Sequence, residues 1–155
     1  MTKAIWGLEK FDIFKGLNAM ELQEVSKISN KVFFQKGEII TDLINESRDV
    51  YVLIQGRVDI ISVQGVSLYR ISVGETFGEL ALVTNIKRTG LAIAREETWV
   101  LILNISHLES LGEGFPDIYK KVYINLVRSL GIKLARANKL IELLKTELTK
   151  SLKNK

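Results

Sequence analysis

The fold and the candidate binding site are indicated most clearly by the stretch FGELALVTNIKRT, residues 77–89. Gly78 permits backbone angles that other residues avoid, so it predicts a tight turn from which one short helical turn begins. The first amides of a helix lack internal partners and attract an anion, and here they belong to Glu79, Leu80 and Ala81. The stretch therefore predicts a small anion-binding loop.

Three side chains add chemistry to this loop. The carboxylate of Glu79 can accept hydrogen bonds from hydroxyl groups, and the guanidinium of Arg88 has the planar fork that suits phosphate. Thr89 adds a hydroxyl and an amide beside that fork. Phosphate donors next to one carboxylate indicate a ligand that carries an anionic phosphate and a sugar with a free hydroxyl.

Three motifs in the chain resemble those of one known family. FGELAL, followed by an Arg nine residues after the Glu, resembles the phosphate-binding cassette of the cyclic nucleotide-binding domain family. KGEII at residues 36–40 resembles the family's early turn, and YVLIQGRV at residues 51–58 resembles its hairpin. The family includes the catabolite activator protein and the regulatory subunits of cyclic AMP-dependent kinase. The likeness covers roughly residues 10–145, with the motifs in the family's order.

The resemblance implies a role for each polar residue of the loop. Glu79 would contact the ribose 2′-hydroxyl, and Arg88 would hold the cyclic phosphate. Taken singly, Glu79 is equally compatible with a solvated helix start, and Arg88 with a surface position or an ion pair to Glu79; their spacing from Gly78 favours the binding role. The candidate ligand-binding residues are Gly78, Glu79, Leu80, Arg88, Thr89 and Asn138.

The sequence decides neither which cyclic nucleotide would bind nor whether one binds at all. Thr89 is compatible with both cyclic AMP and cyclic GMP. Asn138 lies where the family's last helix reaches the purine, and it could equally be a solvated helix residue. Lys87 stands where the family usually has Pro, and Leu91 removes one polar contact that many members have. These departures leave room for a degenerate member that keeps the fold as a dimerisation scaffold and binds no nucleotide.

Length and composition limit the number of domains and the classes of protein to which the chain can belong. The chain has 155 residues, enough for one domain over residues 1–155, with 46% hydrophobic and 26% charged residues. A net charge of +4 is too small to indicate nucleic-acid binding, and there is no Cys for disulfide or thiol chemistry. The N-terminus has no signal-peptide pattern, and no apolar run reaches the ~18–20 residues of a membrane span, so we expect a cytoplasmic protein.

The pattern predicts a mainly β fold with flanking helices: an antiparallel β-roll of the jelly-roll type, short N-terminal helices over residues 5–30 and a long C-terminal helix. Asn18 and Glu21 form a capping signature in the first part. Short runs rich in Val, Ile, Tyr and Phe then alternate with polar or Gly turns and leave no room for crossover helices, which excludes a parallel sheet. The predicted strands are 31–35, 38–41, 49–55, 57–63, 66–72, 91–95 and 98–104.

Residues 106–155 predict the C-terminal helices. Ser106 with Glu109 reads as a capping box, and Pro116 is placed for the first turn of a long helix. That helix carries a heptad seam and a second apolar face. One face can pack on the sheet while the other packs on a second copy, which favours a homodimer; a lone helix with such a seam could instead lie on its own sheet. The seam consists of Val127, Leu130, Leu134, Ala137, Ile141, Leu144 and Leu148, and the second face of Leu126, Leu140 and Leu143.

The sequence therefore predicts a cyclic nucleotide sensor rather than an enzyme. The single His, His107, excludes a metal enzyme of the cupin type, which needs several His ligands, so we expect no metal and no cofactor. Ligand binding is expected to shift the C-terminal helix about a hinge near residues 112–116. The expected partners are a cyclic nucleotide, a second copy of the chain and an unknown protein; the chain could also be the sensor half of a transcription regulator. Neither nucleic-acid binding through the basic tail nor membrane insertion is expected.

Overall fold

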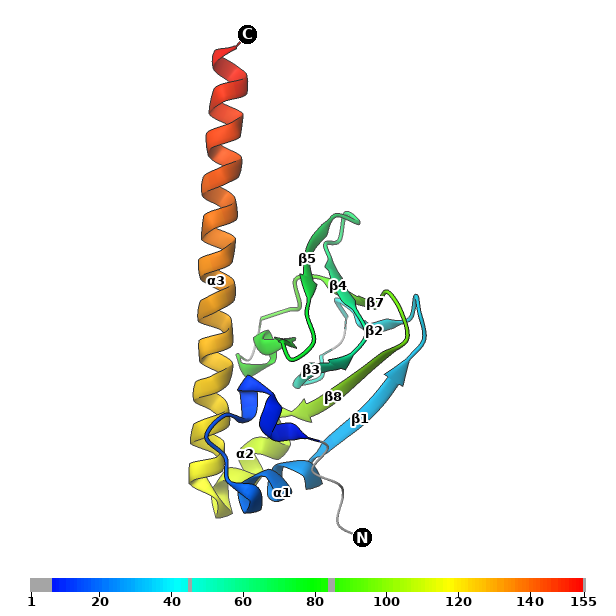
Figure 1. Cartoon of the computed structure of the whole chain (residues 1–155), viewed down its shortest axis with the longest axis vertical. Helices are drawn as coiled ribbons and strands as arrows, with labels where there is room; N and C mark the ends of the chain where they lie inside the picture. Colours follow the sequence, from blue (N-terminus) through cyan, green and yellow to red (C-terminus); the bar gives the residue numbers. More distant parts are fainter. Residues whose placement is uncertain (1–6, 45, 84–85, 155) are drawn as a thin grey trace.

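The computed structural model describes residues 7–44, 46–83 and 86–154. It is an antiparallel β-roll with short helices before it and a long helix after it, as the sequence predicts (Figure 1). The strands are β1 (Ser29–Phe34), β2 (Ile39–Thr41), β3 (Asp49–Gln55), β4 (Val58–Ile61), β5 (Ser67–Ile71), β6 (Thr76–Phe77), β7 (Leu91–Ala94) and β8 (Thr98–Asn104). The helical elements are η1 (Leu8–Lys10), η2 (Asp12–Phe14), α1 (Ala19–Lys27), η3 (Glu79–Leu82), α2 (Ile105–Gly114) and α3 (Pro116–Lys153).

Two four-stranded sheets form the roll. Their strand orders are β1-β8-β3-β6 and β2-β7-β4-β5, and every pairing is antiparallel. Tight Gly turns close the hairpins. Gly56 between β3 and β4 has φ +96°, and a Cβ there would lie 2.5 Å from the Glu97 carbonyl oxygen, so this turn packs directly on the loop before β8.

The central strands β3 and β8 are covered on both faces of their sheet, whereas the edge strand β1 is partly exposed. Val50 and Val52 face the helices, while Tyr51 and Leu53 face the other sheet. The roll therefore has an inner core between its sheets and an outer core beneath the helices. The strand β6 was not predicted, because two residues are too few to show a periodicity.

The N-terminal part is less helical than residues 5–30 predicted. Residues 5 and 6 lie outside the described residues. The following residues form two 3-10 turns and the nine-residue α1, and residues 29 and 30 already belong to β1. The predicted capping box is confirmed: Asn18 Oδ1 accepts from the Glu21 amide at 3.0 Å, and Glu21 Oε2 accepts from the Asn18 amide at 2.7 Å. Glu21 also binds Lys121 of α3 at 2.7 Å, which ties α1 to the long helix.

The predicted cap of the next helix was wrong by two residues. The N-cap of α2 is Asn104, whose Oδ1 accepts from the amides of Ser106 and His107. Ser106 already lies inside the helix, and Glu109 forms an ion pair with Arg48 at 2.7 Å instead of closing a capping box. Asn104 ends β8 directly before the helix, so the strand and the cap share one residue.

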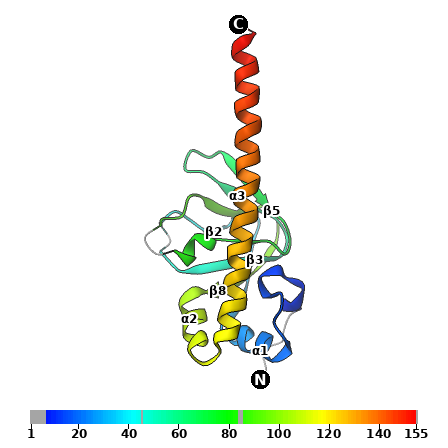
Figure 2. The same cartoon turned by 90° about the vertical axis from the view of Figure 1, so that its left-hand side faces the viewer.

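The long helix α3 starts at Pro116, as predicted, and only its first half packs on the domain. Leu126 is buried there, and Asn125 Nδ2 donates to the carbonyls of Ile13 and Lys15. The second half projects beyond the roll (Figures 1 and 2). Of the second apolar face only Leu126 packs on the domain; Leu140 and Leu143 are 50% and 55% exposed, because the roll ends before the helix does.

Within the described residues, no helix is both long enough and apolar enough to cross a membrane.

Candidate ligand site

The predicted Gly turn is present at the start of η3. Gly78 has φ +79°, and a Cβ there would lie 2.8 Å from Nη1 of Arg88 and 3.0 Å from the Tyr51 ring, so only Gly fits. One expectation was wrong: the amide of Ala81 is not available to a ligand, because it donates to the Gly78 carbonyl at 3.0 Å. Thr84 and Asn85, which complete the quoted stretch, lie outside the described residues.

Arg88 is half-buried and points into the roll. Its Nη2 donates to the carbonyls of Ser47 and Asp49, each at 3.1 Å, and its guanidinium lies 5.6 Å from the centre of the Tyr51 ring. Tyr51 in turn stacks on Phe77, the residue before the Gly turn. Arg88 is thus neither a solvated surface residue nor the ion-pair partner of Glu79.

The charge of Arg88 is not neutralised by the part of the chain that the structure describes. Its Nε is buried and has no hydrogen-bond partner there. Every described ion pair involves other residues. A buried donor on a cation normally has a partner, because leaving one unmade costs about 1–3 kcal/mol or more. The geometry therefore fits an external anion.

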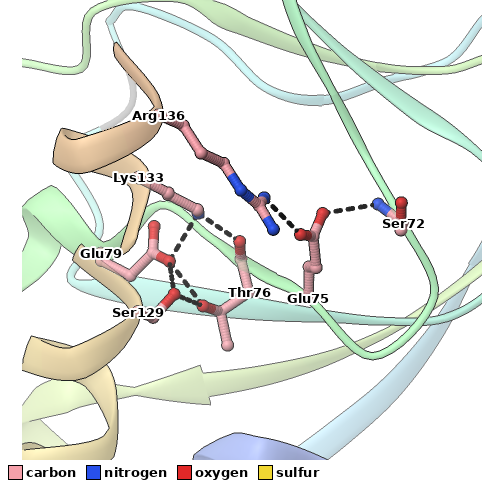
Figure 3. Close-up of polar contacts among 7 residues, drawn as sticks. All are labelled: Ser72, Glu75, Thr76, Glu79, Ser129, Lys133 and Arg136. Atoms are coloured by element: carbon pink, nitrogen blue, oxygen red, sulfur yellow. Dashed lines mark hydrogen bonds and ion pairs between the residues drawn. The ribbon is translucent and has the colours of Figure 1, made fainter. Parts of the chain in front are cut away.

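Glu79 is buried, at 4% exposure, and its donors come partly from α3 (Figure 3). Three side chains converge on its Oε1: Lys133 Nζ at 2.6 Å, Thr76 Oγ1 at 2.5 Å and Ser129 Oγ at 2.9 Å. Lys133 also donates to the Thr76 carbonyl at 2.5 Å. The acid predicted to meet the ribose is therefore held by the long helix.

The ionisation of Glu79 follows from this environment. Burial is the largest influence and raises the pKa of the carboxyl, but the charge of Lys133 and the hydrogen bonds from Lys133, Thr76 and the residue's own amide together lower it below its ordinary value. Glu79 is thus a carboxylate at neutral pH. Because its folded pKa is lowered, its contribution to stability is present at neutral pH and is lost as the pH falls through the folded pKa.

A second ion pair holds α3 next to this site. Arg136 Nη1 lies 2.7 Å from Oε1 of Glu75, whose Oε2 accepts from the Ser72 amide at 2.9 Å (Figure 3). Ser129, Lys133 and Arg136 stand at positions i, i+4 and i+7, so they share one face of α3. That face lies against the turn that carries Glu75 to Glu79.

The structure brings together three of the six predicted site residues. Gly78, Glu79 and Arg88 lie around the same turn, and Leu80, half-buried, continues it as part of η3. Thr89 follows Arg88 and is exposed. Asn138 is exposed on α3, and its side chain makes no hydrogen bond to another residue of the described ranges. Its contact with a base stays a prediction.

Sequence reasoning missed Tyr51, Ser129 and Lys133 as parts of this site. The missed signal was a charge pattern. Two acids four residues apart, Glu75 and Glu79, form ion pairs with two basic residues of α3, more than fifty residues later. Arg136 pairs with Glu75, and Lys133 pairs with Glu79. Such a match becomes visible only when the two segments are known to be neighbours.

A cavity of about 730 Å³ lies between α3, the η2 region and the turn before β6, and Ser129, Lys133 and Arg136 of the same face of α3 help to line it. It contains neither Gly78 nor Arg88. Its charged lining residues are Lys10, Asp12, Lys15, Glu75, Arg128, Lys133 and Arg136. The Gly78 turn and Arg88 therefore lie outside this cavity, although Glu75 and Thr76 beside the turn line it.

The family model of the cyclic nucleotide-binding domain matches residues 31–114. The chain belongs to this family. The match contains the roll, the Gly turn and Arg88, and it ends where α2 ends, so α3 with Ser129 and Lys133 lies outside it. The matched region thus includes the predicted phosphate-binding cassette, residues 77–89.

Known relatives and structures agree with the family. The chain is 32% identical over 122 residues to the potassium channel KAT3 of Arabidopsis thaliana, covering 76% of this chain and 18% of the channel. It is 27% identical over 117 residues to the Pycsar effector protein BcPycTIR of Burkholderia cepacia, covering 75% of this chain and 37% of the effector. The catabolite activator protein of Thermus thermophilus superimposes with a TM-score of 0.71 at 25% identity, covering 86% of this chain and 63% of that protein. The chain thus spans less than two-fifths of the length of the curated relatives.

Proposed function

We propose that this cyclic nucleotide-binding domain binds a 3′,5′-cyclic nucleotide, cyclic AMP or cyclic GMP, and acts as a regulatory sensor rather than as an enzyme. The observation that carries the proposal is the buried Nε of Arg88 beside the Gly78 turn, for which the described residues supply no hydrogen-bond acceptor. A cyclic phosphate diester carries one negative charge, which would neutralise the one guanidinium and give Nε an acceptor.

The neighbouring groups fit the rest of such a ligand. The backbone at Gly78 permits close approach of a phosphate, because no Cβ stands between the turn and Arg88. Glu79 is a carboxylate one residue further on and would accept from the ribose 2′-hydroxyl. Thr89, exposed beside Arg88, is available to the phosphate or to the base. The chemistry thus selects an anionic phosphate linked to a sugar that has a free hydroxyl.

Signal output would pass through α3 and its exposed heptad seam. Leu134 is 63% exposed and Ile141 is 50% exposed, on a helix that projects beyond the roll (Figure 1). A second copy of the chain could cover this seam as a two-stranded coiled coil. Ligand binding would shift α3 about the Gly112–Pro116 region and so change the dimer that a partner protein reads.

Thermal unfolding tests the binding proposal. The ligand would bind the folded chain and not the unfolded chain. Cyclic AMP or cyclic GMP at 100 times its Kd should therefore raise Tm by about 5 °C or more. Adenosine and guanosine, which lack the phosphate, serve as matched controls and should leave Tm unchanged. An unchanged Tm with both cyclic nucleotides at millimolar concentration would contradict the proposal.

A second candidate function is a scaffold that keeps the fold and binds no nucleotide. The observation that favours it is the engagement of Glu79, whose Oε1 already receives three side-chain donors. In this case Lys133 would permanently occupy the acid, and the chain would act only through α3. The same thermal titration separates the two candidates, since a scaffold of this kind gives no shift.

A further inference from the structure

The carboxylate of Glu79 can accept either from a ribose hydroxyl of the ligand or from side chains of α3. In the structure it accepts from Ser129 and Lys133 of α3. We propose that Ser129 and Lys133 form a built-in latch on Glu79, which α3 must release before the carboxylate can accept a ribose hydroxyl. The inference rests on the proposed function and names how the same site is regulated. It predicts that α3 docking weakens cyclic nucleotide binding.

The burial of Glu79 is the first argument that α3 and a ligand compete for its carboxylate. Glu79 is 4% exposed, and the groups that cover it include Ser129 and Lys133, both from α3 (Figure 3). A ligand hydroxyl must come within hydrogen-bond distance of a carboxylate oxygen, about 2.7 Å, to bind it. The side chains of α3 must therefore move before a ribose hydroxyl can reach Oε1, the oxygen that they bind.

Charge is the second argument. The Lys133 ammonium lies 2.6 Å from Oε1, and its side chain is only 20% exposed, so the pair is largely shielded from water. An ammonium binds a carboxylate more strongly than a neutral hydroxyl does. A ribose alone would not displace Lys133, whereas the phosphate attraction to Arg88 supplies a separate driving force for the exchange.

The position of the latch gives it a mechanical consequence. Lys133 bridges Glu79 and the Thr76 carbonyl, so it joins α3 to both ends of the turn that leads into η3. If a ligand opens the latch, it also frees this face of α3 from the roll. By thermodynamic reciprocity, α3 docking lowers ligand affinity by the same factor by which the ligand weakens α3 docking.

The first test compares two single variants of α3 by calorimetry with cyclic AMP and cyclic GMP. Lys133→Met removes the ammonium and keeps most of the stem, so it should tighten binding by about fivefold or more, a typical coupling between two sites. Lys145→Met is the matched control. Lys145 is an exposed lysine further along α3 that takes part in no described ion pair, so its replacement should change Kd by about twofold at most.

Binding that is unchanged or weaker in Lys133→Met would overturn the latch; weaker binding would mean that Lys133 positions Glu79 for the ligand. If the wild type binds with Arg88-dependent affinity and the variant is no tighter, only the latch fails. If the wild type and both variants bind neither cyclic nucleotide, the proposed function fails and the latch fails with it.

A second measurement keeps the wild-type latch and so does not depend on Lys133→Met folding well. The chain has no Cys, so nitroxide labels can be placed solely at Val66→Cys in the roll and Lys139→Cys on α3. Saturating cyclic nucleotide should lengthen or broaden the spin–spin distance between the labels. An unchanged distance while the ligand is bound would contradict release of α3.

Discussion

Arg88→Ala is expected to weaken cyclic nucleotide binding by about 100-fold or more. The substitution removes the guanidinium that would meet the phosphate, and truncating one partner of a buried charge pair costs about 2–5 kcal/mol. The fold should survive, because Arg88 has no described ion pair to lose and donates only to two backbone carbonyls. Calorimetry with cyclic AMP and cyclic GMP measures the loss.

Arg57→Ala is the matched control for that experiment, since Arg57 is an exposed arginine in the turn directly before β4. It should bind like the wild type. Circular dichroism should show that Arg88→Ala and Arg57→Ala unfold within a few degrees of the wild type. Affinity retained in a folded Arg88→Ala protein would show that the phosphate does not bind at this guanidinium.

Leu134→Glu combined with Ile141→Glu is expected to convert a dimeric chain into monomers. The two positions lie seven residues apart in the predicted seam, and both side chains are exposed on the isolated chain. In a dimer each would be buried, and burying an unpaired carboxylate costs several kcal/mol, so self-association should weaken by about 100-fold or more. Sedimentation measures the mass of both proteins.

The control for the seam is Lys139→Glu with Thr146→Glu. These positions have the same seven-residue spacing on α3, and both lie outside the seam. This variant should keep the oligomeric state of the wild type. A wild-type chain that sediments as a monomer at tens of micromolar, or a seam variant that stays dimeric, would contradict a dimer through α3.

Local chemistry explains what the sequence could predict. The Gly78 turn, the Asn18–Glu21 cap and the start of α3 at Pro116 each depend on residues within a few positions of one another. The roll was predictable because Val, Ile and aromatic residues alternate in short runs between turns. The spacing of Arg88 from Gly78 favoured a shared site, and the structure places the guanidinium beside that turn; its role in binding stays a prediction.

What could not be predicted depends on contacts between distant segments. Lys133 is 54 residues from Glu79 in the chain, and nothing near either residue indicates the pair. Leu140 and Leu143 look like core residues on a helical wheel, yet the roll does not extend far enough to cover them. The cap at Asn104 was missed because the nearby Ser106 and Glu109 have the spacing of a capping box, while the strand runs directly into the helix.

The most direct measurement of the central claim observes the Arg88 Nε–H group itself. In a protein labelled with ¹⁵N-arginine, the Nε–H signal that disappears in Arg88→Lys identifies this group. Saturating cyclic AMP or cyclic GMP should move that signal strongly, because Nε gains a phosphate oxygen as its acceptor, and adenosine should not move it. A signal that keeps its position at saturating concentrations of both cyclic nucleotides would contradict the account.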